Sequence, residues 1–173
     1  MKWFENEKVS VIWTVLRIWL GIQWIEAGWH KVVDGFAAEG FLQGAIVKAT
    51  GDHPAVQAWY ANFLENFALP NVKLFNFLIP WGEVLVGVGL IVGIATIPAL
   101  LAAAFMNLNF LLAGTVSTNP VLFTVAIILL FVGKGAYIWG GDRFILPYVK
   151  EKFFNKKDNG KNHPHTNKKA MAL

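Results

Sequence analysis

The sequence predicts an all-α integral membrane protein, an antiparallel four-helix bundle with a long extracytoplasmic helical loop between its first two spans. Hydrophobic residues make up 55% of the 173-residue chain and charged residues only 15%, whereas a soluble domain carries about a quarter charged residues. The charges gather at the two ends and in one loop, which leaves long apolar blocks between them. We therefore expect one membrane domain, residues 1–149, and a basic tail, residues 150–173, that is disordered.

Four apolar blocks are long enough to cross a bilayer, which takes roughly 20 residues. They comprise residues 9–29, 75–97, 99–116 and 121–139. The first block is too long for a cleavable signal peptide, and a charge interrupts it. The connections after the second and third blocks are only a few residues long, so neighbouring helices must run antiparallel.

The longest connection, residues 30–74, is expected to be helical in part. Apolar side chains at helical spacing run through residues 54–67, and Asp52 is a candidate N-cap for that helix. Residues 38–50 form a weaker second helix. An amphipathic pair of this kind would lie on the mouth of the bundle or in the lipid interface.

The lysine-rich tail places the C-terminus in the cytoplasm under the positive-inside rule. With four spans, the N-terminus is then cytoplasmic too, and the long connection lies outside. Since the excess positive charge belongs to the tail, it does not indicate a nucleic-acid partner; the bilayer is the expected one.

Three charged residues, Arg17, Glu83 and Lys134, interrupt the apolar blocks. A charge at membrane depth costs on the order of several kcal/mol unless it is paired or hydrated. They should therefore face one another or a polar cavity. Counted from the span ends, Arg17 and Glu83 lie within reach, and we expect them to form a central ion pair. Lys134 is nearer the cytoplasmic side, where it reaches Glu83 or extends to the interface.

One face of the first span carries a regular stripe. Arg17, Gly21, Trp24, Gly28 and Lys31 recur at intervals of four, three, four and three residues, which places them along one side of a helix. Glycines at this spacing let a partner backbone approach closely. The stripe therefore predicts both a helix contact and a row of functional side chains.

The third span carries two asparagines, Asn107 and Asn109, of which only one can face the charges. Asn107 shares its stripe with Phe110 and Gly114, which makes it the better candidate. A buried network of Arg, Glu and Asn has two interpretations: it forms a functional polar cavity, or it only fixes the register of the helices.

Several kinds of cofactor do not fit the composition. The chain contains no cysteine, so it carries no thiolate or iron–sulfur chemistry of its own. Its histidines are His30, His53, His163 and His165, which lie at the outer end of the first span, in the loop or in the tail and do not form a haem ligand pair at membrane depth. No dinucleotide fingerprint, phosphate loop or zinc spacing occurs. We expect no metal and no covalent cofactor.

Several short motifs occur in order along the chain. They are Arg17-x-x-Leu20-Gly21, Gly28-x-x-Lys31, Gly82-Glu83, Asn107-x-Asn109 and Gly140-Gly-Asp142-Arg143. Together they resemble the DoxX/DoxD family of small four-span membrane proteins over residues 11–147. The resemblance implies a multi-pass protein of a bacterial plasma membrane. It also implies a link to thiosulfate:quinone oxidoreductase, in which electrons from thiosulfate pass to membrane quinone.

Two functions are weighed. In the first, the chain is a quinone-linked redox subunit in which Glu83 and Arg17 are catalytic. The residues predicted to bind the quinone are Arg17, Glu83, Asn107, Lys134 and Trp24, with Lys31 attracting an anionic donor. In the second, the chain is a non-enzymatic membrane organiser whose buried charges are structural. Either function allows a partner redox subunit or a homo-oligomer. Transport through the polar core has less support, because four short spans show no inverted repeat.

Overall fold

The computed structural model describes residues 3–154, and within this range all regular secondary structure is helical. The elements are, in chain order, η1 (Trp3–Glu5), α1 (Glu7–Val33), α2 (Ala38–Val47), α3 (Ala58–Phe63), η2 (Leu64–Ala68), α4 (Val72–Val92), α5 (Thr96–Leu112), α6 (Asn119–Val132), α7 (Lys134–Tyr137) and α8 (Asp142–Phe154).

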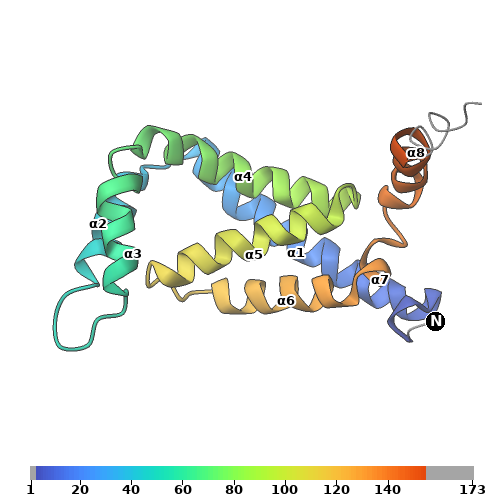
Figure 1. The fold of residues 1–173 in the computed structure, drawn as a ribbon, viewed down its shortest axis with the longest axis horizontal. Helices are drawn as coiled ribbons and strands as arrows, with labels where there is room; N and C mark the ends of the chain where they lie inside the picture. Colours follow the sequence, from blue (N-terminus) through green and yellow to red (C-terminus); the bar gives the residue numbers. More distant parts are fainter. Residues whose placement is uncertain (1–2, 155–173) are drawn as a thin grey trace, which may run out of the picture.

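The helices α1, α4, α5 and α6 lie side by side, while α2, α3 and η2 lie across one end of them (Figure 1). We call these last three elements the capping layer. Of the bundle helices, α1 and α4 are long and apolar enough to cross a membrane, and α5 and α6 are shorter apolar helices. Large hydrophobic side chains cover the sides of the bundle, among them Val15, Leu85, Phe105 and Phe131. A surface of this kind suits lipid rather than water.

The contact between α1 and α4 rests on glycines. A methyl group added at Gly21 would lie 2.9 Å from the backbone oxygen of Gly87, and one added at Gly28 would lie 2.8 Å from the backbone nitrogen of Val84. The glycine stripe expected from the sequence is thus the surface on which the two backbones meet. Residues later in α1 contact residues earlier in α4, so the two helices run antiparallel.

Three of the predicted spans end earlier than expected, since α4 ends at Val92, α5 at Leu112 and α6 at Val132. Gly93 closes α4 in the left-handed conformation, with φ of 70°, which glycine adopts without a Cβ penalty. Gly133 has φ of 62° and ends α6 at Val132. The predicted continuous span to residue 139 is therefore wrong, since the short helix α7 follows the break.

Other boundaries also differ from the sequence prediction. Asp52 does not cap a helix, because α3 begins only at Ala58, after the predicted first turn. The weaker helix expected over residues 38–50 is present as α2. The helix α8 extends to Phe154, beyond the predicted domain end at residue 149. The rest of the predicted tail lies outside the described residues.

Hydrogen bonds from the capping layer and from Lys48, the residue after α2, fix this end to the bundle. The Tyr60 hydroxyl donates to the backbone oxygen of Asn109 at 3.1 Å, and Lys48 Nζ donates to the backbone oxygen of Gly114 at 3.1 Å. The backbone nitrogen of Ala38 donates to Asn76 Oδ1 at 2.7 Å. These bonds hold the layer over the ends of α4 and α5.

Burial raises the pKa of Tyr60 to about 12, from the ordinary value of about 10. Because the folded protein favours the neutral hydroxyl, Tyr60 contributes to the free energy of unfolding through this pKa difference. That contribution is complete below pH 10 and disappears as the pH rises through 12. We expect the thermal unfolding midpoint of the wild type to fall more steeply between pH 10 and 12 than that of Tyr60→Phe. The comparison isolates Tyr60, because all other titrating groups are common to both proteins. Parallel pH curves for the two would contradict the prediction.

Candidate functional site

A cavity of about 300 Å³ lies at the capping-layer end of the bundle, and we call it the polar cavity. Side chains of α1, α4 and α5 and of the turn between α5 and α6 form its walls. Its polar lining residues are Gln23, Trp24, Lys31, Glu83, Asn107, Thr115, Ser117, Thr118 and Asn119. Phe36, Phe41 and Phe110 complete much of the wall. The cavity thus combines charge, hydroxyl groups and aromatic rings.

The charged pair in the polar cavity is Lys31 with Glu83. Lys31 Nζ donates to both carboxylate oxygens of Glu83, each at 2.6 Å. Only 1% of the Glu83 side chain is exposed, against 29% of Lys31. The ammonium group also lies 5.8 Å from the ring centre of Phe36 and 5.7 Å from that of Phe110, within cation–π range. The Glu83 carboxylate is therefore buried, and two aromatic rings shield the ammonium group of Lys31.

The sequence brings the pair together through Gly28, one helical turn before Lys31. A methyl group at Gly28 would lie 2.8 Å from Glu83 Cβ and 2.9 Å from the backbone oxygen of Pro80. The backbone of α4 therefore rests directly on α1 at this level. The side chains of Lys31 and Glu83 therefore meet, and Glu83 rather than Gly82 is the partner of the Gly28-x-x-Lys31 motif.

Asn107 and Trp24 face the same cavity with unused hydrogen-bonding capacity. Asn107 is fully buried, and neither atom of its side-chain amide has a hydrogen-bond partner among residues 3–154. Trp24 is 2% exposed, and its Nε1 likewise lacks a partner within the described part of the chain. Because a buried polar group without a partner costs about 1–3 kcal/mol, these groups are available to hydrogen-bond a molecule held in the cavity.

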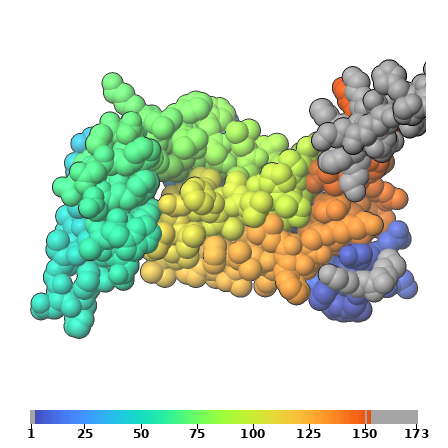
Figure 2. Space-filling view, in the orientation of Figure 1, coloured from blue at the N-terminus to red at the C-terminus, as the bar shows by residue number. Residues whose placement is uncertain are grey.

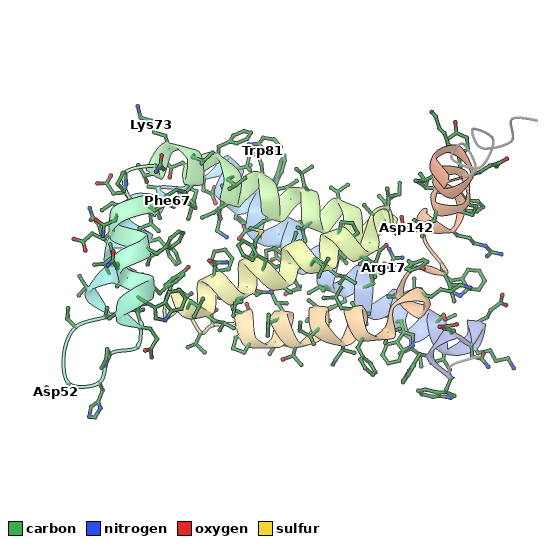
Figure 3. The ribbon with its side chains drawn as sticks, in the orientation of Figure 1. Arg17, Asp52, Phe67, Lys73, Trp81 and Asp142 are labelled. Carbon is green, nitrogen blue, oxygen red and sulfur yellow. The ribbon has the colours of Figure 1, made fainter. Side chains whose placement is uncertain are left out.

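Arg17 does not pair with Glu83, so the predicted central ion pair is wrong. Arg17 is buried near the α7 end of the bundle, where Figure 3 shows it beside Asp142. Its Nη1 donates to the backbone oxygen of Leu90 and its Nη2 donates to that of Trp139 at 3.2 Å. The register of α1 on α4 sets Gly28, not Arg17, opposite Glu83.

Asp142 completes the arrangement around Arg17. Its carboxylate accepts hydrogen bonds from the backbone nitrogens of Ala95 and Thr96, both at 2.8 Å, and so caps the start of α5. The backbone nitrogen of Asp142 donates to the oxygen of Gly93 at 2.7 Å. Arg17 and Asp142 thus fasten the α7–α8 segment to the turn between α4 and α5.

Lys134 was predicted to join the quinone-binding residues, but it is exposed at the first position of α7 and does not line the polar cavity. The break at Gly133 sets it at the far end of the bundle. The other predicted residues, Lys31, Trp24, Glu83 and Asn107, all line the cavity.

Sequence reasoning missed the hydroxyl-bearing rim of the cavity. Thr115, Ser117 and Thr118 line it from the α5–α6 turn, and Asn119 lines it from the first position of α6. The sequence prediction treated this stretch as a connection only. A run of short polar side chains between two apolar blocks was the available signal. Gln23 on α1 was missed as well, since it falls beside the glycine stripe rather than on it.

These features define a helical membrane protein with a buried polar cavity at one end of its bundle. The chain belongs to the DoxX family, whose model matches residues 12–116. The match contains Lys31, Glu83 and Asn107, and it confirms the resemblance found in the sequence. Comparison with curated proteins and with solved structures gave no match.

The contact at Gly28 can be tested by adding one methyl group. Gly28→Ala should destabilise the protein by about 1–3 kcal/mol, because the new methyl group meets the backbone of α4. Gly44→Ala is the matched control: nothing lies within 4 Å of a methyl group there, so better helix propensity should stabilise it by about 0.5–1 kcal/mol. Unfolding midpoints in detergent measure both effects. Equal midpoints would show that α1 and α4 do not meet at Gly28.

Proposed function

We propose that the chain crosses the membrane four times, through α1, α4, α5 and α6 together with α7. At 1.5 Å per residue, the 17 residues of α5 span about 26 Å and the 14 residues of α6 about 21 Å. The hydrocarbon core is about 30 Å thick, so α7 is needed to complete the fourth crossing. The basic tail supports cytoplasmic termini in a bacterial plasma membrane, with the capping layer outside.

We further propose that the protein is a quinone-linked redox subunit whose polar cavity holds the quinone headgroup. The observation that carries this proposal is the fully buried Asn107 amide, which faces the Lys31–Glu83 pair without a partner of its own among the described residues. A quinone offers carbonyl oxygens to hydrogen-bond donors and a flat ring to aromatic walls. The residues present fit both requirements.

Each residue then has a distinct role. Asn107 Nδ2 and Trp24 Nε1 donate hydrogen bonds that orient the carbonyl oxygens, and Phe110 packs against the ring. Reduction of a quinone consumes two electrons and two protons. Glu83 exchanges protons with the headgroup, and Lys31 holds its carboxylate in place. The electrons come from a partner redox subunit in the same membrane.

A second candidate function is that of a membrane organiser whose buried charges are structural. One observation favours it: both hydrogen bonds of Arg17 go to backbone oxygens, those of Leu90 and Trp139. An arginine held in this way fastens helices together and leaves little for a ligand. Experiments can distinguish the two functions. The first predicts that substitutions in the polar cavity reduce bound quinone, and the second predicts that substitutions at Arg17 reduce stability.

Replacing Asn107 by leucine tests the headgroup site. Loss of one buried hydrogen bond should weaken quinone binding about three- to tenfold. The folded protein should keep its stability or gain some, because a buried amide without a partner is removed. Quinone content per purified protein, measured by extraction and mass spectrometry, and the unfolding midpoint give the two results.

Glu83→Gln should lower the unfolding midpoint, because it removes one member of a buried ion pair. The protein that remains folded should bind quinone but lose its reduction, since the amide cannot exchange the proton. Asn62→Leu on the exposed face of α3 is the control for Asn107→Leu. Quinone levels that are equal in Asn107→Leu and in the control would exclude the polar cavity as the headgroup site.

Arg17→Met distinguishes structural from ligand-binding charge. Hydrogen bonds to a charged group are worth about 1.5–3 kcal/mol each, so the loss of the bonds to Leu90 and Trp139 should lower the unfolding midpoint and the membrane level. The quinone bound per folded molecule should not change, because Arg17 lies outside the polar cavity. Arg143→Met, an exposed arginine at the same end, is the control. If the Arg17→Met protein is folded but contains no quinone, Arg17 contributes to quinone binding and the prediction is wrong.

A further inference from the structure

A second cavity, of about 470 Å³, lies between the capping layer and the helices α4 and α5, and we call it the apolar cavity. Figure 2 shows a recess in the surface where the capping layer meets these helices. Its wall is dominated by phenyl rings, those of Phe41, Phe63, Phe67, Phe75, Phe105 and Phe110. Several of these are partly exposed, with Phe63 at 40%, Phe67 at 51% and Phe105 at 67%. The cavity therefore opens sideways, through rings rather than through polar groups.

The polar groups in the apolar cavity are already used. The Tyr60 hydroxyl lies 3.1 Å from the backbone oxygen of Asn109 and 3.0 Å from its Oδ1. Asn109 Nδ2 donates to the backbone oxygen of Phe105 at 2.8 Å. Asn109 Nδ2 thus has a partner, and Asn109 Oδ1 shares the one Tyr60 proton with the backbone oxygen of Asn109. Asn107, two residues earlier, has no partner for either amide atom within residues 3–154. The apolar cavity offers dispersion and apolar contact, and the polar cavity offers hydrogen bonds.

The two cavities adjoin. Phe41 and Phe110 line both of them, and their rings meet edge to face with centres 6.1 Å apart. One pair of side chains therefore separates a site suited to a polar headgroup from a site suited to an apolar chain. Both volumes lie within the range of about 300–1,000 Å³ that is usual for ligand pockets.

We propose that the apolar cavity holds the polyisoprenoid tail of the quinone whose headgroup occupies the polar cavity. This inference rests on the proposed function. The tail leaves the headgroup past the Phe41–Phe110 pair, whose rings turn aside from their edge-to-face contact to admit it. It then runs along the rings beneath the capping layer and enters the bilayer at the lateral opening. The capping layer acts as one wall of the binding site, which assigns a role to α3 and η2 beyond covering the bundle.

Gly82 supplies the variant that tests the tail site. It lines the apolar cavity and does not line the polar one. A methyl group there would lie 3.5 Å from the flexible end of Met106, so Gly82→Leu can be accommodated with its side chain in the cavity. Gly40→Leu, on the open face of α2 with nothing within 4 Å, is the matched control.

The experiment compares the affinity of the full-length protein in detergent for two probes, a tail-less benzoquinone and the same ring with a polyisoprenoid tail. The wild type should bind the tailed probe at least about tenfold more tightly, since that ratio needs only about 1.4 kcal/mol of buried chain. Gly82→Leu should abolish this preference and leave the tail-less probe unaffected, and Gly40→Leu should change neither affinity. A tailed probe bearing a diazirine should label peptides that contain Phe63, Phe67 or Phe105.

Other outcomes overturn the inference in distinguishable ways. A separate apolar pocket between α4 and α5 is lined by Leu85 and Val88. Labelling there, with both probes still bound, would remove the tail from the apolar cavity and leave the headgroup site intact. Displacement of the label by excess diacyl phospholipid, with the tail-less probe retained, would make the cavity a site for lipid acyl chains. Equal weakening of both probes in Gly82→Leu would also refute the tail site. Absence of saturable binding of either probe would refute the proposed function together with the inference.

Discussion

The close approach of α1 and α4 at Gly28 is the constraint on which the site depends. A carboxylate as deeply buried as Glu83 is tolerated only when a cation lies against it, because removing either member of a buried pair costs about 3–5 kcal/mol. Lys31 meets this requirement since the two backbones touch one turn away. The same contact fixes the heights of Trp24 on α1 and of Glu83 on α4, and so defines two walls of the polar cavity.

The buried polar groups at the two ends of the bundle are satisfied in different ways. Near α7, Arg17 donates to backbone oxygens of α4 and of the segment after α7, and Asp142 accepts from backbone nitrogens at the start of α5. Only Arg17 Nε lacks a partner among the nitrogen and oxygen atoms of these two side chains within the described residues. Near the capping layer, Lys31 and Glu83 hydrogen-bond to one another, and the neighbouring Asn107 has partners for neither amide atom among the described residues. The first arrangement locks the fold. The second retains hydrogen-bonding capacity that a ligand can use, which is the physical reason for placing function at that end.

The sequence predicted which faces of the helices carry the chemistry, but not their relative heights. Helical periodicity placed Lys31 on the glycine stripe and favoured Asn107 over Asn109, and the structure agrees on both positions. It could not reveal that Glu83 meets Lys31 instead of Arg17. Axial register depends on which backbone positions of α4 meet the glycines of α1, and that packing involves residues far apart in the sequence.

The error over Lys134 has a related cause. Hydropathy alone does not distinguish a continuous apolar helix from two helices joined at a glycine, and Gly133 divides the last block. Its positive φ is available to glycine at little cost. The polar rim of the cavity was overlooked for the opposite reason, because short hydroxyl side chains in a turn are usually read as turn formers. Only the structure shows that these side chains line the same cavity as Lys31 and Glu83.

The position of the polar cavity joins two environments that a quinone must use together. On one side, the exposed Ser117 and Thr118 of the α5–α6 turn lead from the cavity to the surface of the protein. In the proposed function, this is the side from which protons would reach Glu83. On the other side, Phe41 and Phe110 lead to the lateral opening toward lipid. A water-soluble ligand would gain nothing from the phenyl-lined side, and a simple lipid chain would leave the Asn107 amide without a partner. A ligand with a carbonyl-bearing ring and an apolar tail satisfies both sides, so the arrangement of the two cavities supports a quinone more specifically than either cavity does alone.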